Sequence, residues 1–155
     1  MRFKEGVSAI LGADLETSKT NPLTGWDAVV NSGVKPQTRA KFVKVPHHGS
    51  KTGHHPKFWS DLAEENPVGI LTEFSSHSLP LERDIDRLKS LTSELYCTTV
   101  PKVKIPKRDK TIEKTMNNVV RTRRVLSASS LGRVTLRIGE RGTYEVDLSP
   151  HSFKL

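Results

Sequence analysis

The chain has 155 residues with a net charge of +8 and a pI near 9.8, which fits one domain, or one lobe of a larger one, with an anionic partner such as nucleic acid. Its single cysteine, Cys97, excludes an intrachain disulfide framework and is expected to be a small buried residue on a strand. No apolar run reaches the roughly 20 residues of a membrane span, and the N-terminus lacks a signal-peptide apolar region, so we expect a cytoplasmic protein without a membrane partner.

In chain order, the first predicted element is a strand over 2–13, which is apolar towards its end. The segment 17–39 carries several Asn, Gly and Pro turn signals and is predicted to be loop, with one or two helical turns at 26–30. A second strand follows at 41–46, where a short apolar run indicates burial.

From Pro56 onward, helical and strand patterns alternate. Pro56 suits the first turn of a helix, which is expected to stop at Asn66-Pro67. The apolar run 68–71 is typical of a strand covered on both faces. Pro80 opens the next predicted helix, and a strand follows at 95–98. This alternation predicts a layered α/β unit.

The segment 101–124 has a different character, because Lys and Arg crowd into it and large apolar residues are few. We interpret it as a basic insert, either a flexible solvated segment or a site for phosphate contacts. Beyond it, 133–138 and 143–148 alternate polar and apolar residues around a Gly-containing turn. This pattern predicts a β-hairpin with one solvated face.

Two motifs place polar side chains at the ends of predicted strands. The first is Gly12-Ala13-Asp14-Leu15-Glu16, and the second is Lys44-Val45-Pro46-His47-His48-Gly49-Ser50-Lys51. A carboxylate and an imidazole, each held at the end of a rigid strand, are what a catalytic metal site needs.

With these motifs the chain resembles the C-terminal half of a metallo-β-lactamase-fold hydrolase. The likeness is greatest to the C-terminal nuclease-like domain of bacterial competence DNA-uptake channel proteins. In that group an apolar strand ends in Gly-Asp-x-Glu, and a Lys-Val-Pro-His-His-Gly-Ser-Lys-Thr string follows, which residues 44–52 match. The family's later Gly-His-Pro-His-Pro stretch is matched in part by Ser76-His77-Ser78-Leu79-Pro80.

The resemblance covers most of 3–99 and, more weakly, 131–148. It implies an α/β fold, namely the C-terminal lobe of a four-layer αββα metallo-β-lactamase fold. Such a lobe is a mixed β-sheet with flanking helices, here with a C-terminal β-hairpin. The whole chain, 1–155, is then a single half-domain.

The resemblance also implies metal ligands. Asp14 is expected to bridge two metal ions, and Glu16 is the alternative because one extra residue separates Gly12 from Asp14. Adjacent residues of an extended segment point to opposite sides, so one histidine of the pair is expected to ligate and the other to support it. The family pattern favours His48 as the ligand and His47 as the supporting residue of the metal site.

Three further side chains are candidates for catalysis or substrate binding. Ser50 and Lys51 suit a phosphate, by hydroxyl and by charge, although a solvated loop is an equal alternative for Lys51. His77 precedes a predicted helix N-terminus and is expected to contact phosphate or transfer a proton, with a plain helix-cap region as the alternative. Gly49 would allow the backbone to approach a ligand closely.

The family's N-terminal motif, His-x-His-x-Asp-His, has no counterpart here. The chain alone offers one carboxylate and one imidazole, fewer than the roughly three protein ligands of a catalytic zinc site. We therefore expect part of a phosphodiesterase or nuclease with two divalent metal ions, zinc or manganese. The missing half would come from another polypeptide or a second copy, or would belong to a longer protein of which this chain is a fragment.

The alternative is a non-catalytic module on a degenerate half-fold that binds nucleic acid or protein. In either case a lone half of the fold is expected to expose an apolar sheet face, and such a face favours association.

Overall fold

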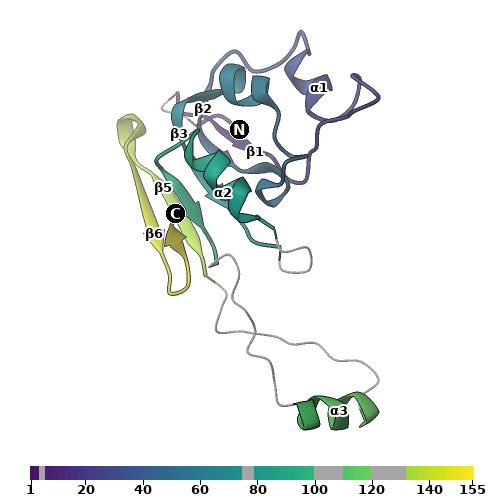
Figure 1. Cartoon of the computed structure of the whole chain (residues 1–155). Coiled ribbons are helices and arrows are strands. Elements are labelled where there is room, and N and C mark those ends of the chain that lie inside the picture. Colours follow the sequence, from purple (N-terminus) through teal and green to yellow (C-terminus); the bar gives the residue numbers. More distant parts are fainter. Residues whose placement is uncertain (4–5, 75–78, 100–109, 120–131) are drawn as a thin grey trace.

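The computed structural model describes residues 1–3, 6–74, 79–99, 110–119 and 132–155. The protein is α/β, with a mixed five-stranded sheet in the order β1-β2-β3-β4-β7 and a separate two-stranded hairpin, β5-β6 (Figure 1). The strands are β1 Ala9–Leu11, β2 Ala40–Lys44, β3 Ala63–Leu71, β4 Leu95–Cys97, β5 Val134–Ile138, β6 Tyr144–Leu148 and β7 Phe153–Lys154. The helical segments are α1 Gly25–Val30, η1 Pro46–Gly49, η2 Phe58–Leu62, α2 Glu82–Lys89, α3 Lys110–Val119 and η5 Glu140–Gly142.

The first four strands of the sheet pair in parallel and in sequence order, and β7 joins β4 antiparallel. Leu11 lies opposite Lys44, which in turn lies opposite Ile70. Because parallel strands share a direction, the loops that follow β1, β2 and β3 meet at one edge of the sheet.

One face of the sheet packs against the helical segments. Side chains of alternate strand residues, such as Val43 and Leu71, form a core with Trp26, Phe58 and Leu88. Cys97 is fully buried in the same core, as expected for a strand residue. Burial of such apolar surface is the main stabilising contribution to the fold.

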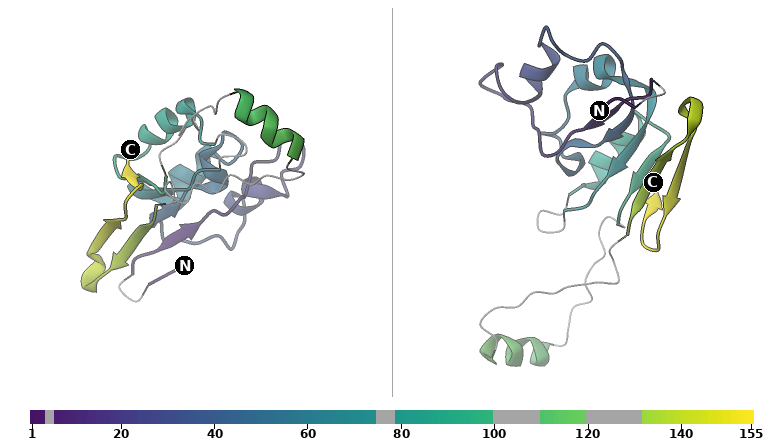
Figure 2. Two further views of the ribbon diagram at one scale, coloured as in Figure 1. Left: turned by 90° about the horizontal axis from the view of Figure 1, so that it is seen from below. Right: turned by 180° about the vertical axis from the view of Figure 1, so that it is seen from behind.

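The opposite face of the sheet is covered by the hairpin β5-β6 (Figure 2). The face is formed by Ala9, Phe42, Val68 and Tyr96, all at most 8% exposed. The ring of Tyr144 on β6 meets Phe42 edge-on at 5.3 Å. The expectation of an exposed apolar sheet face is therefore wrong for these residues, because the chain supplies its own cover.

The predicted strand over 2–13 is too long. The backbone turns at Gly6, whose φ is +78°, and Met1 folds back so that the Ala9 N–H donates to its carbonyl at 2.8 Å. The isolated pairing of Arg2 with Ser8 belongs to the same antiparallel return. Only Ala9–Leu11 enters the parallel sheet.

The predicted helix after Pro56 also ends earlier than expected. It finishes with the π-helical turn Phe58–Leu62, and β3 then runs through Asn66-Pro67. The pairing of β2 with β3 is irregular here, because Ala40 pairs with Ala63 but Phe42 pairs with Val68. A bulge of this kind accommodates a proline, which has no N–H for the ladder.

The other predicted elements are confirmed, with α2 starting at Glu82 just after Pro80. Within the basic insert 101–124, α3 is the part that the structure describes, and the remainder lies outside the described residues. No helix in the described part of the chain is long and apolar enough to span a membrane.

Candidate metal centre

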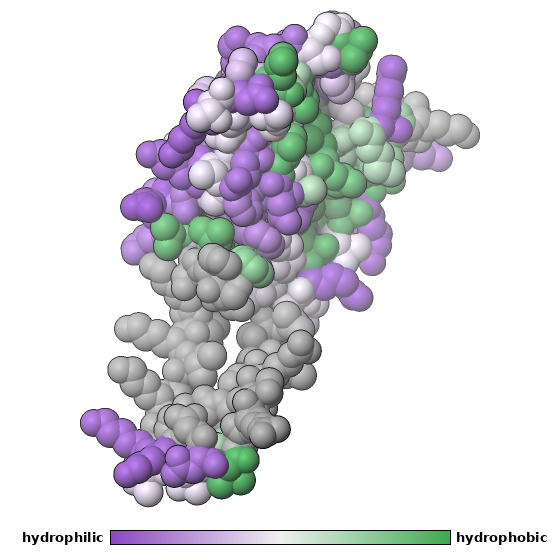
Figure 3. All heavy atoms as spheres, turned by 90° about the vertical axis from the view of Figure 1, so that its right-hand side faces the viewer, coloured by the Kyte–Doolittle hydropathy of each residue, from purple (hydrophilic) through white to green (hydrophobic). Residues whose placement is uncertain are grey.

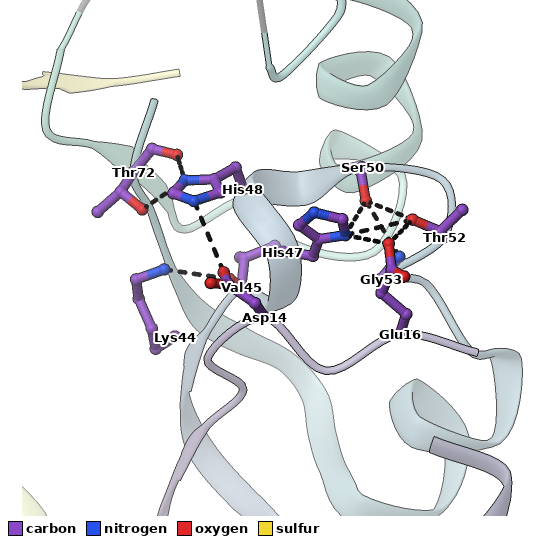
Figure 4. A network of polar contacts seen from close by, with 10 residues as sticks. All are labelled: Asp14, Glu16, Lys44, Val45, His47, His48, Ser50, Thr52, Gly53 and Thr72. Carbon is purple, nitrogen blue, oxygen red and sulfur yellow. Dashed lines mark hydrogen bonds and ion pairs between the residues drawn. The ribbon is translucent and has the colours of Figure 1, made fainter. Parts of the chain in front are cut away.

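The two sequence motifs come together at the edge where the parallel strands end (Figure 4). Asp14 and Glu16 follow β1, and His47 and His48 follow β2. Thr72 follows β3 directly. Ligand sites of open parallel sheets are commonly found at this edge.

Backbone hydrogen bonds hold the loop after β1 against the loop after β2. The Gly12 N–H donates to the Lys44 carbonyl at 3.2 Å, and the His47 N–H donates to the Ala13 carbonyl at 2.8 Å. A Cβ atom on Gly12 would lie 2.5 Å from Cγ of Pro46, so only glycine allows this approach. The arrangement places Asp14 beside His48.

Both loops contain residues in the left-handed helical region. The φ values are +43° at Ala13, +43° at His47 and +50° at His48. This conformation costs about 1–2 kcal/mol for each residue other than glycine. Such residues concentrate at functional sites, where the surroundings hold them. The expected extended conformation of the histidine pair is therefore wrong, yet the two side chains still enter separate groups of contacts.

Asp14 and His48 form the first group. Oδ1 of Asp14 lies 3.6 Å from Nε2 of His48, while Nδ1 of His48 lies 3.0 Å from the Thr72 carbonyl oxygen. A carbonyl oxygen only accepts hydrogen bonds, so this contact is satisfied by the tautomer with the proton on Nδ1, in which the Thr72 hydroxyl, 3.1 Å from the same nitrogen, is a second acceptor. In a neutral ring, Nε2 then directs its lone pair at a carboxylate oxygen.

Two acceptor atoms that face each other call for a cation or a proton between them. Two ligands of a tetrahedral zinc ion, each about 2.0–2.1 Å from the metal, are about 3.4 Å apart. The observed 3.6 Å between Asp14 and His48 is close to this spacing. The hydrogen bond to Thr72 is also the kind of contact that orients metal-binding histidines in proteins.

Neighbouring groups fix the orientation of His48 and its loop. The His48 ring stacks on Phe74 with centroids 5.0 Å apart. Arg87 of α2 donates to the Gly49 carbonyl at 2.6 Å and pairs with the buried Asp84 at 3.2 Å. Gly49 itself packs against core leucine side chains, so its small size serves this packing.

Lys44 adds positive charge near the pair. Its Nζ donates to the Val45 carbonyl at 3.2 Å. Burial lowers the pKa of Lys44, and the negative charge of Asp14 opposes this shift.

His47 forms the second group, with Glu16, Ser50 and Thr52. Its Nδ1 lies 2.5 Å from Oε1 of Glu16, and the Thr52 hydroxyl donates to the same oxygen at 2.5 Å. The buried Ser50 hydroxyl lies 3.1 Å from Nδ1 of His47 and accepts the Gly53 N–H at 3.1 Å. The Ser50 hydroxyl is thus engaged within the loop.

The remaining predicted residues are less closely associated. Glu16 contacts His47 and not His48, while Lys51 is exposed on the same loop. His77 lies outside the described residues. Sequence reasoning missed Thr72, although its position directly after a predicted parallel strand is a signal that could have identified it.

The donor set is only part of a metal centre. In the ranges that the structure describes, no group of three or more His, Cys, Asp and Glu side chains could hold a metal ion. Asp14 and His48 supply two donors, and a catalytic zinc site takes about three from protein. The pair therefore fits a metal ion only if further ligands are added. The chain has no significant match among protein-family models, curated proteins or solved structures.

Proposed function

We propose that this chain is the C-terminal portion of a metal-dependent hydrolase of the metallo-β-lactamase superfamily, acting as a phosphodiesterase or nuclease. The observation that carries the proposal is the Asp14–His48 pair, which lies at the ends of adjacent parallel strands and is oriented by Thr72. The two motif likenesses support the same reading. The sheet would then be one half of the four-layer αββα fold.

In the complete enzyme, divalent ions such as zinc or manganese would activate water and neutralise phosphate charge. Asp14 and His48 are the residues of this chain that hold metal, and the Thr72 carbonyl keeps Nε2 of His48 free for it. Lys44 places a positive charge beside Asp14, and the exposed Lys51 suits a substrate phosphate.

The missing ligands would come from a polypeptide carrying the N-terminal half, or from a second copy. Figure 3 shows a band of hydrophobic side chains on one face of the molecule. Exposed large hydrophobic residues among those described include Leu11, Leu23 and Val34, with exposed fractions of 70%, 83% and 93%. A contiguous hydrophobic band such as the one in Figure 3 favours association with another chain.

The test is zinc titration by calorimetry on the full chain, with elemental analysis and light-scattering mass on the same sample. We expect Asp14→Ala and His48→Ala each to weaken zinc binding at least about tenfold, because each removes one of the two donors. Asp61→Ala and His151→Ala are matched controls at exposed sites. Equal zinc affinity in all five proteins would contradict the proposal. The light-scattering mass shows whether the zinc-bound protein is a monomer or an oligomer.

A second candidate function is a polyanion-binding module, favoured by the distribution of charge. The segment 101–124 holds nine of the 25 Lys and Arg residues but only two of the 17 acidic ones. The rest of the chain then has 16 basic and 15 acidic residues, a net charge of +1. Nearly all of the basic excess therefore belongs to this one segment, where Lys and Arg would make salt-sensitive phosphate contacts.

A further inference from the structure

Helix α3 has an apolar side and a polar side (Figure 3). Ile112, Met116 and Val119 are spaced by four and three residues, so they lie along one side of the helix. Lys110 and Lys114 lie on the opposite side at about 3.6 residues per turn. A helix of ten residues is marginal in water on its own, and an amphipathic helix gains most of its stability by burying its apolar side. The apolar side of α3 therefore calls for a surface on which it can be buried.

The core of the sheet does not supply that surface. Ile112 and Val119 are 54% and 79% exposed, and neither belongs to the hydrophobic clusters of the described residues. In Figure 1, and in the right-hand view of Figure 2, α3 lies apart from the sheet. Exposed apolar side chains that gather on one side of an element, bordered by polar ones, mark an interaction surface.

The charge of the surrounding sequence indicates the kind of partner. Besides Lys110 and Lys114, the segment 101–124 holds seven further Lys and Arg residues and only two acidic ones, Asp109 and Glu113. An anionic partner is complementary to this charge. Nucleic acid would match the charge, but a row of aliphatic side chains has no counterpart along a phosphate backbone. An anionic lipid bilayer matches both features, because its phosphate headgroups lie directly above a hydrocarbon interior.

We propose that α3 binds to the surface of an anionic lipid bilayer. The helix lies in the plane of the interface, with Ile112, Met116 and Val119 at the acyl chains and the lysine ammonium groups at the headgroup phosphates. Its ten residues are too few to span a bilayer. The expectation of no membrane partner came from the lack of a spanning run, which surface binding does not need. The inference names the polyanion of the second candidate function, on which it rests for the charge attraction only.

The inference is tested by sedimentation of the full chain with lipid vesicles. We expect binding to vesicles of equal parts phosphatidylcholine and phosphatidylglycerol, and little binding to phosphatidylcholine alone. Ile112→Ser/Val119→Ser should weaken binding to the anionic vesicles at least about tenfold, since burial of aliphatic side chains contributes on this scale. Serine has a helix propensity close to those of isoleucine and valine, so the helix itself is little affected. Thr115→Ser/Asn118→Ser, a matched change at exposed positions of α3 outside the apolar stripe, should bind as the parent does.

Binding of a single-stranded oligonucleotide separates this inference from the second candidate function. Phosphate contacts do not use the apolar stripe, so Ile112→Ser/Val119→Ser should keep the parent's oligonucleotide affinity. Equal binding of the parent and this variant to anionic vesicles would overturn the inference, because the attraction would then be by charge alone, and would leave the second candidate function in place. Binding to the oligonucleotide without binding to vesicles would identify nucleic acid as the partner and would also overturn it. A parent chain that binds neither probe would contradict both.

Discussion

At the scale of single residues, Gly12 decides whether Asp14 can reach His48. A Cβ atom at this position would lie 2.5 Å from Cγ of Pro46 and 2.9 Å from the Lys44 carbonyl oxygen. We expect Gly12→Ala to cost about 1–3 kcal/mol of stability, as overpacked sites do. Because the loop after β1 must move, zinc affinity should fall as well.

Gly33→Ala is the matched control, since a Cβ atom there has nothing within 4 Å. Urea unfolding and zinc titration are measured on both variants. Identical behaviour of the two would show that the contact between the loops does not position Asp14.

The lowered pKa of His54 should make the stability of the fold depend on pH. Burial lowers its pKa from 6.5 to about 4, and the charges of Arg87 and His55 add to the shift. Between pH 6.5 and about 4, His54 therefore binds a proton in the unfolded chain but not in the folded chain. The stabilisation is therefore present above pH 6.5 and is lost as pH falls towards about 4.

His54→Phe tests this linkage, because it removes the titrating ring and keeps an aromatic ring near Trp59, 6.3 Å away in the parent protein. We expect the melting temperature of this variant to fall less steeply than that of the parent over the same pH window. His151→Gln, at an exposed site, controls for loss of a histidine. Parallel pH curves for parent and His54→Phe would refute the role of His54.

At the residue scale, the sequence motifs indicated which side chains lie close together but not the backbone conformations that bring them there. The motifs single out Asp14 and His48, and the structure places these two side chains next to each other. The left-handed backbone conformation of His47 and His48 could not be predicted from the local sequence, because residues other than glycine rarely adopt it. It is held by contacts with Ala13 and with α2, which pattern alone does not reveal.

At the scale of elements, the hairpin β5-β6 acts as the cover of one sheet face. Leu136 on β5 packs against the cluster around Phe42 and Val68, whereas Leu148 at the end of β6 is 41% exposed. We expect Leu136→Ala to destabilise the fold by about 1–3 kcal/mol, less than most fully buried leucines do, because Leu136 is partly exposed.

Leu148→Ala is the control for the hairpin and should change stability by about 0.5 kcal/mol or less, as surface substitutions usually do. Urea unfolding of both variants gives the comparison. Equal losses, or none, would mean that the hairpin does not stabilise the sheet through this face.

Periodicity predicted most of the elements but not how they pack. The alternation in 133–138 and 143–148 predicted the hairpin and its apolar side. What that side covers depends on contacts between Val134 or Val146 and residues far away in sequence. The start of β3 at Ala63 was also missed, because its irregular pairing with β2 interrupts the pattern.

At the scale of the whole molecule, charge and fold are divided between different parts of the chain. The sheet and hairpin come from residues outside 101–124, where the net charge is +1. The basic segment is inserted between β4 and β5, and its α3 lies apart from the sheet in Figure 1 and in the right-hand view of Figure 2. One deletion can therefore test the proposed metal binding and the proposed polyanion binding separately.

The structure shows where to make that deletion. The Gly132 N–H donates to the Thr98 carbonyl at 2.8 Å, so the chain returns to β4 before it enters β5. Replacing 100–131 with a short Gly-Ser linker should keep the fold. Each halving of a flexible loop lowers its closure cost by about 0.6 kcal/mol, so we expect equal or slightly greater stability.

The deletion variant is then compared with the parent by zinc titration and by fluorescence anisotropy with a labelled single-stranded oligonucleotide. We expect unchanged zinc affinity, because Asp14 and His48 are untouched, and loss of most oligonucleotide affinity together with its salt dependence. A full-length variant with Ser at every Lys and Arg of 101–124 separates charge from length. Undiminished binding in the deletion variant would assign the polyanion site to the sheet domain. Because the net charge outside 101–124 is only +1, the sheet domain would then have to bind through individual lysine side chains, such as Lys44 and Lys51, beside the Asp14–His48 pair.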